Sequence, residues 1–228
     1  SLWLFWALQQ YIRYSGDKTV WKNYGSYLKL ILNSFREGAP NNIHMLPNGL
    51  LYAGFHGQPV TWMDAVVDGK PVTPRTGLAV EVNALWYNAI CFACELAENA
   101  NDKDFVNSWK PIAEKIPAAF VDTFWYKEKN YLYDYVLDDF HDKSVRPNQV
   151  FATSLPYSPL NDDQRKGVLD CVKSELLTPR GLRTLSPKNP AYKSEYTGNI
   201  SQRDMAYHQG SVFPWLFGHF AEGWLKLY

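Results

Sequence analysis

The sequence contains few cysteines and no excess of either charge. Only three of its 228 residues are cysteines, an odd number that argues against a framework of disulfide bonds and favours a reducing compartment, so we expect a cytoplasmic protein. Lys and Arg together number 23, and so do Asp and Glu, so no net electrostatic field attracts nucleic acid or an anionic membrane. We therefore expect neither of these as a partner.

Long apolar runs and metal-binding spacings are also lacking. No uninterrupted apolar segment reaches the ~18 residues that a membrane span needs. The five histidines show neither HxxxH nor HExxH spacing, and there is no glycine-rich phosphate-binding loop. We therefore expect no metal or other cofactor. An apolar content of 46% excludes a disordered chain and predicts a single domain over residues 1–228 with its own core.

Aromatic residues, by contrast, are abundant. Nine Trp, 15 Tyr and 12 Phe make up 16% of the chain. Large rings bury much area in any core, so the excess alone does not define a function. Flat aromatic faces also match the apolar C–H faces of sugar rings, and this makes carbohydrate the first ligand class to consider.

Apolar residues recur at spacings of three and four along most of the chain, which predicts helices. We expect them at about 2–10, 17–35, 79–98, 101–120, 148–155, 161–176 and 206–227. Pro111 and Pro117 should bend or split the fourth helix. Residues 131–142 alternate Tyr, Leu and Val with Asp, which predicts a short β-hairpin within a loop.

The connections between these helices alternate between short and long. Short links lie near 15–17, 99–102 and 156–161, and long ones near 37–78, 125–146 and 178–205. Because successive helices run up and down, every second connection lies on the same face, so the three long loops should share one face. Long loops are often functional. The pattern predicts an all-α ring of helical hairpins. Seven helices do not complete six hairpins, so we expect a fragment truncated at both ends.

Five strings carry a resemblance to a known family. They are TWMDA (61–65), TPRTGLAVEVNALWYNA (73–89), RPNQVFATSLP (146–156), LLTPRGLRTLSP (176–187) and RDMAYHQGSVFPW (203–215). In this order and spacing they resemble the C-terminal glucosidase domain of bacterial and archaeal glycogen-debranching enzymes. The resemblance implies an (α/α)6 toroid that hydrolyses α-1,6 branch linkages of glycogen or limit dextrin with inversion, as part of cytoplasmic glycogen breakdown.

Inverting hydrolysis requires a general acid and a general base, two carboxyl groups ~6.5–9.5 Å apart. The resemblance assigns the acid to Asp64, whose apolar sequence neighbours predict a wall that keeps it protonated. Asp204 and Glu195 are the nearest local candidates for the base. Related eukaryotic enzymes resemble HQGPEW where this chain has His208 to Phe213, and Val212 in that stretch cannot act as a base. We therefore expect the base outside this chain and little activity from the chain alone.

Polar and aromatic residues of the same strings are predicted to contact the sugar. Amides, carboxylates and guanidinium groups pair with adjacent hydroxyl groups, and indole rings stack on sugar faces. Helix capping by Glu81 or Asn83, and core packing by Trp86, are the structural alternatives. The predicted contacts are Trp62, Arg75, Glu81, Asn83, Trp86, Arg146, Asn148, Gln149, His208 and Gln209.

Two other functions are compatible with these residues. One is another toroid glycosidase, similar to glucoamylase, trehalase or mannosidase. The other is a non-catalytic glycan-binding remnant that keeps the sugar-binding face. An open ring would leave apolar helix faces uncovered, so a homodimer through the exposed hairpin edges is also expected.

Overall fold

The computed structural model describes residues 1–228, in which helices form the main scaffold. None of them is both long and apolar enough to cross a membrane. The helices are α1 (Leu2–Ser15), α2 (Val20–Glu37), α3 (Val80–Asn99), α4 (Lys103–Phe124), α5 (Phe151–Ser154), α6 (Asp162–Glu175), α7 (Ile200–Tyr207) and α8 (Trp215–Leu225), with a 3₁₀ helix, η1, over Pro147–Val150.

Short antiparallel strands occupy the long loops. Three two-stranded sheets pair β1 (His44–Met45) with β2 (Leu51–Tyr52), β3 (Val66–Val67) with β4 (Lys70–Pro71), and β6 (Trp125–Tyr126) with β7 (Tyr131–Leu132). Two three-stranded sheets have the orders β5 (Leu78–Ala79), β8 (Tyr135–Leu137), β9 (Phe140–His141) and β10 (Leu177–Thr178), β11 (Gly181–Arg183), β12 (Val212–Phe213). The chain is therefore mainly helical, as expected, but it is not all-α, because short strands pair within the long loops and, at β5 and β8, between two of them.

The predicted helices are present, with one clear correction. The expected helix over 206–227 begins only at Trp215, as α8, because Val212 and Phe213 pair with β11; α7 lies almost entirely within the predicted third long loop and was not expected. The prolines Pro111 and Pro117 do not split α4, which continues through both of them and packs along α3. The expected hairpin forms between β8 and β9, whereas β7 pairs back with β6.

The core forms around α3, which packs against α1, α2, α4 and α5. Its apolar side chains are buried on nearly all sides, as expected for a helix surrounded by others. Aromatic rings fill the space toward α4, where Trp86 and Trp109 meet edge to face with ring centroids 5.8 Å apart. The helices therefore supply a rigid layer from which the loops extend.

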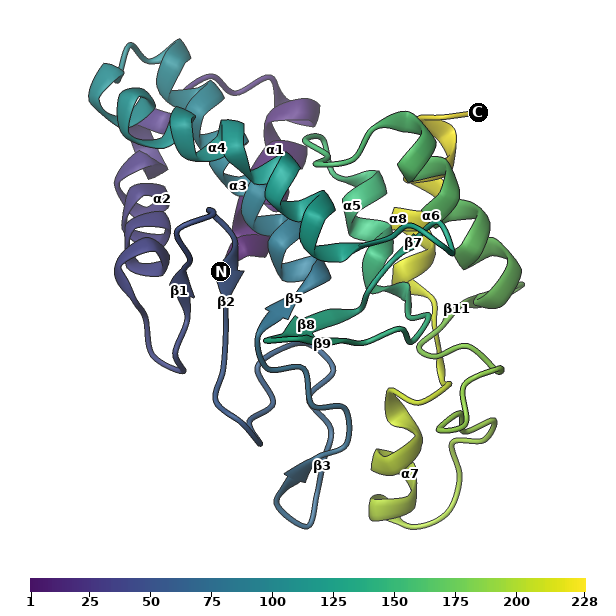
Figure 1. Cartoon of the computed structure of the whole chain (residues 1–228). Helices are drawn as coiled ribbons and strands as arrows, with labels where there is room; N and C mark the ends of the chain where they lie inside the picture. The colour runs from purple at the N-terminus through teal and green to yellow at the C-terminus, as the bar shows by residue number, and fades with distance from the viewer.

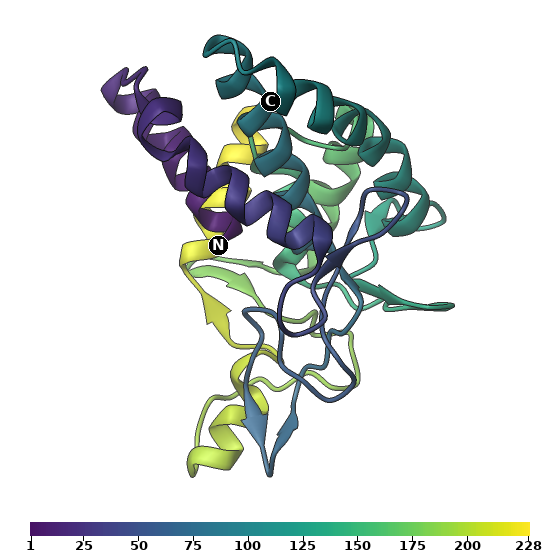
Figure 2. The same cartoon turned by 90° about the vertical axis from the view of Figure 1, so that its left-hand side faces the viewer.

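The three long loops lie on one side of this helical layer, as predicted from their alternation with short links (Figures 1 and 2). Backbone contacts join them there. Ala53 and Gly77 form a β-bridge within the first loop, and β5 pairs with β8 of the second. Helix α7 of the third loop packs against β3 of the first. Residues far apart in the sequence therefore meet on one face.

The junction of the first two loops depends on Gly77. Its φ is 107°, and a Cβ at this position would lie 2.5 Å from the carbonyl oxygen of Val136. Gly57 also has a positive φ, of 82°, but open space surrounds it. We expect Gly77→Ala to lower the free energy of unfolding by about 1–3 kcal/mol more than Gly57→Ala, because only the former adds a steric clash. Urea denaturation measures both, and equal losses would contradict the crowding at β8.

Candidate functional site

A buried ionic network connects the loops, and Arg75 lies at its centre. The Nε of Arg75 donates to Oδ2 of Asp134 at 2.7 Å, and its two Nη atoms donate to the two carboxylate oxygens of Glu81, one of them at 2.6 Å. Arg75 is only 2% exposed. Burial opposes its charge, but the charges of Asp134 and Glu81 outweigh this effect and raise the pKa of Arg75.

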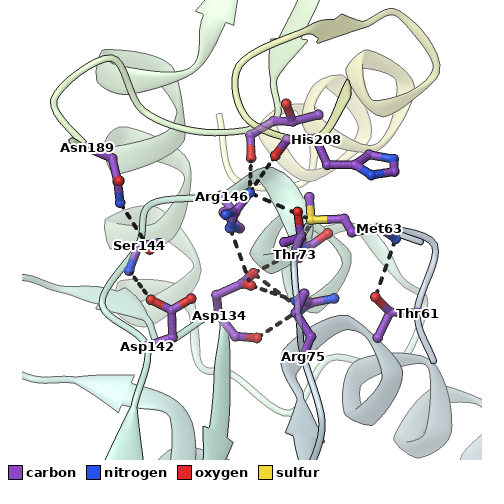
Figure 3. A network of polar contacts seen from close by, with 12 residues as sticks. Thr61, Met63, Thr73, Arg75, Asp134, Asp142, Ser144, Arg146, Asn189 and His208 are labelled. Atoms are coloured by element: carbon purple, nitrogen blue, oxygen red, sulfur yellow. Dashed lines mark hydrogen bonds and ion pairs between the residues drawn. The ribbon is translucent and has the colours of Figure 1, made fainter. Parts of the chain in front are cut away.

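Arg146 is the second buried cation, and it reaches the third loop. Its Nη1 donates to the carbonyl oxygens of Thr184 at 3.1 Å and His208 at 2.7 Å, and its Nη2 donates to Oε1 of Gln209 at 3.0 Å (Figure 3). Its Nε lies 3.7 Å from Oδ2 of Asp134. Burial lowers the pKa of Arg146, and the charge of Asp134 opposes this shift. Asp134 thus lies between two guanidinium groups.

The network closes through Gln209 and balances its charges. The Nε2 of Gln209 donates to the carbonyl oxygen of Val72 and to Oγ1 of Thr73, both at 3.2 Å, which returns the chain of contacts to the first loop. The two guanidinium groups face two carboxylates, so the buried cluster has no net formal charge. Buried charges need such pairing because removal from water is costly.

Trp62 takes its orientation from this network. Asn148 donates from Nδ2 to Oδ1 of Asp134 at 2.7 Å, and its own Oδ1 accepts from Nε1 of Trp62 at 2.7 Å. The indole then packs edge to face against His208, Phe213 and Trp215, with centroid distances of 5.3, 5.7 and 5.2 Å. Of the ten predicted sugar contacts, only Trp62 is not buried.

Asp64 follows Trp62 by two residues and lies in irregular backbone just before β3. Its side chain is exposed, so the apolar wall expected from its sequence neighbours does not enclose it. The neighbouring residues point elsewhere: Met63 is fully buried and approaches Asn148 and Arg146 through its sulfur. Asp64 is therefore accessible from solvent, two residues along the chain from the fixed indole ring of Trp62.

His208 lies behind Trp62 and is only 1% exposed. Burial lowers the pKa of its imidazole to about 4, against the opposing charge of Asp64. Its Nδ1 is buried and has no hydrogen-bond partner. The ring is therefore neutral near pH 7, and Asp64 does not face an imidazolium ion.

Besides His208, seven of the predicted contact residues are at most 6% exposed, and they bind other parts of the protein. Asn83 contacts the backbone of Leu51 through both ends of its amide, and Trp86 donates from Nε1 to the carbonyl oxygen of Gly49 at 2.9 Å. Gln149 accepts from the backbone of Leu132. A direct sugar contact stays a prediction for all seven, whose positions favour support of the site: Arg75, Glu81, Asn83, Trp86, Arg146, Asn148 and Gln149.

Asp134 is the residue that the sequence analysis did not single out. It lies in a tyrosine-rich stretch between Leu132 and Val136, and all three side chains are buried. Residues i, i+2 and i+4 of an extended segment face the same side. A carboxylate on the apolar face of such a segment was the available signal, and it points to a buried partner of opposite charge.

The two local candidates for a general base differ in their surroundings. Asp204 is half-buried on α7, the helix that packs against β3 directly after Asp64. Glu195 is exposed in the irregular segment before α7. The packing of α7 on β3 brings the element of Asp204 beside that of Asp64.

The family model described as amylo-alpha-1,6-glucosidase matches residues 1–228. The chain belongs to this family. The resemblance to glycogen-debranching enzymes is thereby confirmed, and the glycogen debranching enzyme of Saccharomyces cerevisiae is 25% identical over 219 residues, covering 75% of this chain. The chain spans only 14% of that yeast enzyme.

A sialidase of known structure has a similar fold. It superposes with a TM-score of 0.69 and covers 92% of this chain and 18% of its own, at 12% identity. At this identity the similarity concerns the fold alone. Family membership places the chain among glycoside hydrolases, and the arrangement of Trp62, Asp64 and His208 is its candidate site.

The buried network makes a prediction about Asp134. Asp134→Asn removes one anion and leaves Arg146 without a carboxylate partner, so we expect the free energy of unfolding to fall by about 3–5 kcal/mol. The control is Asp139→Asn, since Asp139 is exposed in the same β8–β9 hairpin and should change stability by less than about 0.5 kcal/mol. Urea denaturation of both variants checks this, and similar losses would contradict the importance of the network.

The buried histidines predict how stability depends on pH. Burial lowers the pKa of His208 and of His219 from 6.5 to about 4, so between these values the unfolded chain binds more protons than the folded one. The free energy of unfolding therefore falls as pH decreases from 6.5 toward 5, with a slope that approaches about 1.4 kcal/mol per pH unit for each histidine.

We expect His208→Gln to reduce this slope by the share of one histidine. His56→Gln, at an exposed position, should leave the slope unchanged. Urea titrations at several pH values between 5 and 7 give the slopes. A His208→Gln slope equal to that of the wild type would show that His208 is not held neutral.

Proposed function

We propose that this chain is the part of a glycogen-debranching enzyme that binds a branched α-glucan and cleaves its α-1,6 linkages with inversion. Family membership supports the glycosidase class, and the yeast relative supports glycogen or a similar glucan as the substrate. The observation that carries the proposal is an accessible carboxyl group, Asp64, two residues along the chain from an indole ring that buried hydrogen bonds hold in place.

Asp64 is the proposed general acid. It must carry a proton when the leaving oxygen departs. A cation beside a carboxyl group favours its ionised form, so the neutral state of His208 removes an influence that would oppose proton donation. Trp62, which is partly exposed and two residues from Asp64, offers a flat ring on which a glucose unit can stack. We propose a direct sugar contact for Trp62, and we propose that His208 and Gln209, which are buried, support it from within the protein.

The base is proposed to lie on a segment outside these residues, with Asp204 as the alternative within the chain. The packing of α7 on β3 supports Asp204 as that alternative. The closed (α/α)6 ring, the cytoplasmic location and the homodimer remain parts of this proposal that stand on the sequence analysis.

Hydrolysis of a phosphorylase limit dextrin tests the proposal, with and without added azide. If the base is absent, the wild-type chain releases glucose at close to the background rate, and azide, a small nucleophile, restores turnover to a product of inverted configuration. Asp64→Asn should lower the azide-supported rate by about 10²-fold or more, because it removes the proton donor.

Asp68→Asn is the matched control, since Asp68 is exposed in the turn after β3. Release of glucose by the wild type without azide would overturn the external base and turn attention to Asp204, to be tested as Asp204→Asn. Binding of the dextrin without turnover under either condition would favour a glycan-binding remnant. Full activity of Asp64→Asn would refute its role as the acid.

A further inference from the structure

A hollow of about 460 Å³ lies at the third long loop, and neither Trp62 nor Asp64 lines it. An extended segment, residues 192–197, forms one wall, and β11, β12 and the end of α7 form the others. Side chains alternate along this segment: Tyr192, Ser194 and Tyr196 line this hollow, whereas Lys193, Glu195 and Thr197 line another. The volume of the hollow lined by Tyr192, Ser194 and Tyr196 lies within the range of small-ligand sites, about 300–1,000 Å³.

Most of the polar side chains that line this hollow have no partner within the protein; the exception is Ser211, whose Oγ donates to the carbonyl oxygen of Ala206. The Arg183 guanidinium makes no ion pair or side-chain hydrogen bond, and the hydroxyls of Tyr192, Tyr196 and Tyr207 are equally unengaged. This is the opposite of Arg75, whose donors are all used in the buried network. A guanidinium group and several phenol hydroxyls together offer donors and acceptors suited to a ligand with many hydroxyl groups.

Flat rings face the same hollow. Tyr196 is 48% and Tyr207 38% exposed, and their ring centroids lie 5.7 Å apart. Phe213 closes the back, with its ring 5.2 Å from that of Tyr207. Tyrosine provides a large rigid face and a polar tip at low cost in conformational entropy. Exposed rings beside free hydroxyls match a sugar, which has apolar C–H faces and a polar rim.

The walls are held in place before any ligand binds. The backbone N–H of Lys193 donates to the carbonyl oxygen of Gln209 at 2.6 Å, and that of Tyr192 donates to Asn189 at 3.0 Å. Gly210 has a φ of 146°, and a Cβ there would lie 2.7 Å from the Tyr192 ring, so only glycine allows this close approach. A preformed hollow reduces the entropy cost of binding.

A layer of two rings separates this hollow from Trp62. His208 and Phe213 stack with centroids 5.9 Å apart, and Trp62 packs on both of them. Tyr207 contacts His208 from the hollow, with centroids 4.6 Å apart. The hollow therefore adjoins the site of Asp64 without containing any of its proposed sugar contacts.

We propose that this hollow is a second carbohydrate-binding site, which takes a linear α-1,4-linked glucan segment such as the chains that carry a branch. The choice of an α-glucan rests on the proposed function, whereas the choice of a neutral sugar rests on the unpaired donors and exposed rings described above. Arg183 and Tyr196 are its main contacts.

Binding of maltohexaose to the full chain, measured by isothermal titration calorimetry, tests this site. We expect Tyr196→Ala and Arg183→Ala each to weaken binding about tenfold, the loss that follows from removing one important contact. Tyr27→Ala is the matched control, because Tyr27 is 62% exposed on α2 and should bind like the wild type. Circular dichroism checks that the folds are unchanged, and cellohexaose checks selectivity for the α-linkage.

Two outcomes would overturn the inference: no binding of maltohexaose by the wild type, or equal affinity in the wild type, Tyr196→Ala and Arg183→Ala. Asp64→Asn separates this inference from the proposed function. If that variant and the wild type both bind maltohexaose, but the wild type forms neither glucose without azide nor β-glucosyl azide with it, the second site stands and the hydrolytic proposal fails. If hydrolysis depends on Asp64 but the affinity for maltohexaose is unchanged in Tyr196→Ala and Arg183→Ala, the hydrolytic proposal stands and the second site fails.

Discussion

The candidate functional face of this protein depends on one buried carboxylate held between two guanidinium groups. Asp134 accepts from Arg75 at 2.7 Å and lies 3.7 Å from Nε of Arg146, and these residues come from two different long loops. The loops have little regular structure, since their strands are only two or three residues long. Charge pairing therefore holds the loops in position, whereas backbone hydrogen bonds and apolar packing hold the helices.

Such a network is a positioning device more than a source of stability. Charges removed from water regain most of the lost solvation only through their partners, so the intact cluster contributes little net stability. A missing member, however, leaves an uncompensated charge inside the protein. Alternative loop arrangements are therefore destabilised, because any of them would separate the ions and leave buried charges without partners. The network passes this constraint through Asn148 to Trp62, and so to the surroundings of Asp64.

The distinction between engaged and free polar groups organises the face of the molecule. The guanidinium groups of Arg75 and Arg146 donate hydrogen bonds inside the protein, whereas that of Arg183 lines a hollow. All three belong to strings that resemble the same family and contain similar residues. Sequence context alone ranked the first two as sugar contacts, and it ranked Arg183 nowhere. A binding surface for hydroxyl-rich ligands requires free polar groups at the surface and a layer of rigid, hydrogen-bonded groups beneath them.

The sequence by itself determined the family, most helices and the common face of the long loops. The order of five strings identifies the family, apolar periodicity gives the helices, and alternating connection lengths place the loops. Only the tertiary structure decided which polar side chains meet. Arg75 and Asp134 are 59 residues apart in the chain, and the break between α7 and α8 arises from pairing of β12 with β11. Helix periodicity is a local property, whereas ion pairs and strand pairing depend on distances between distant segments, which no local pattern encodes.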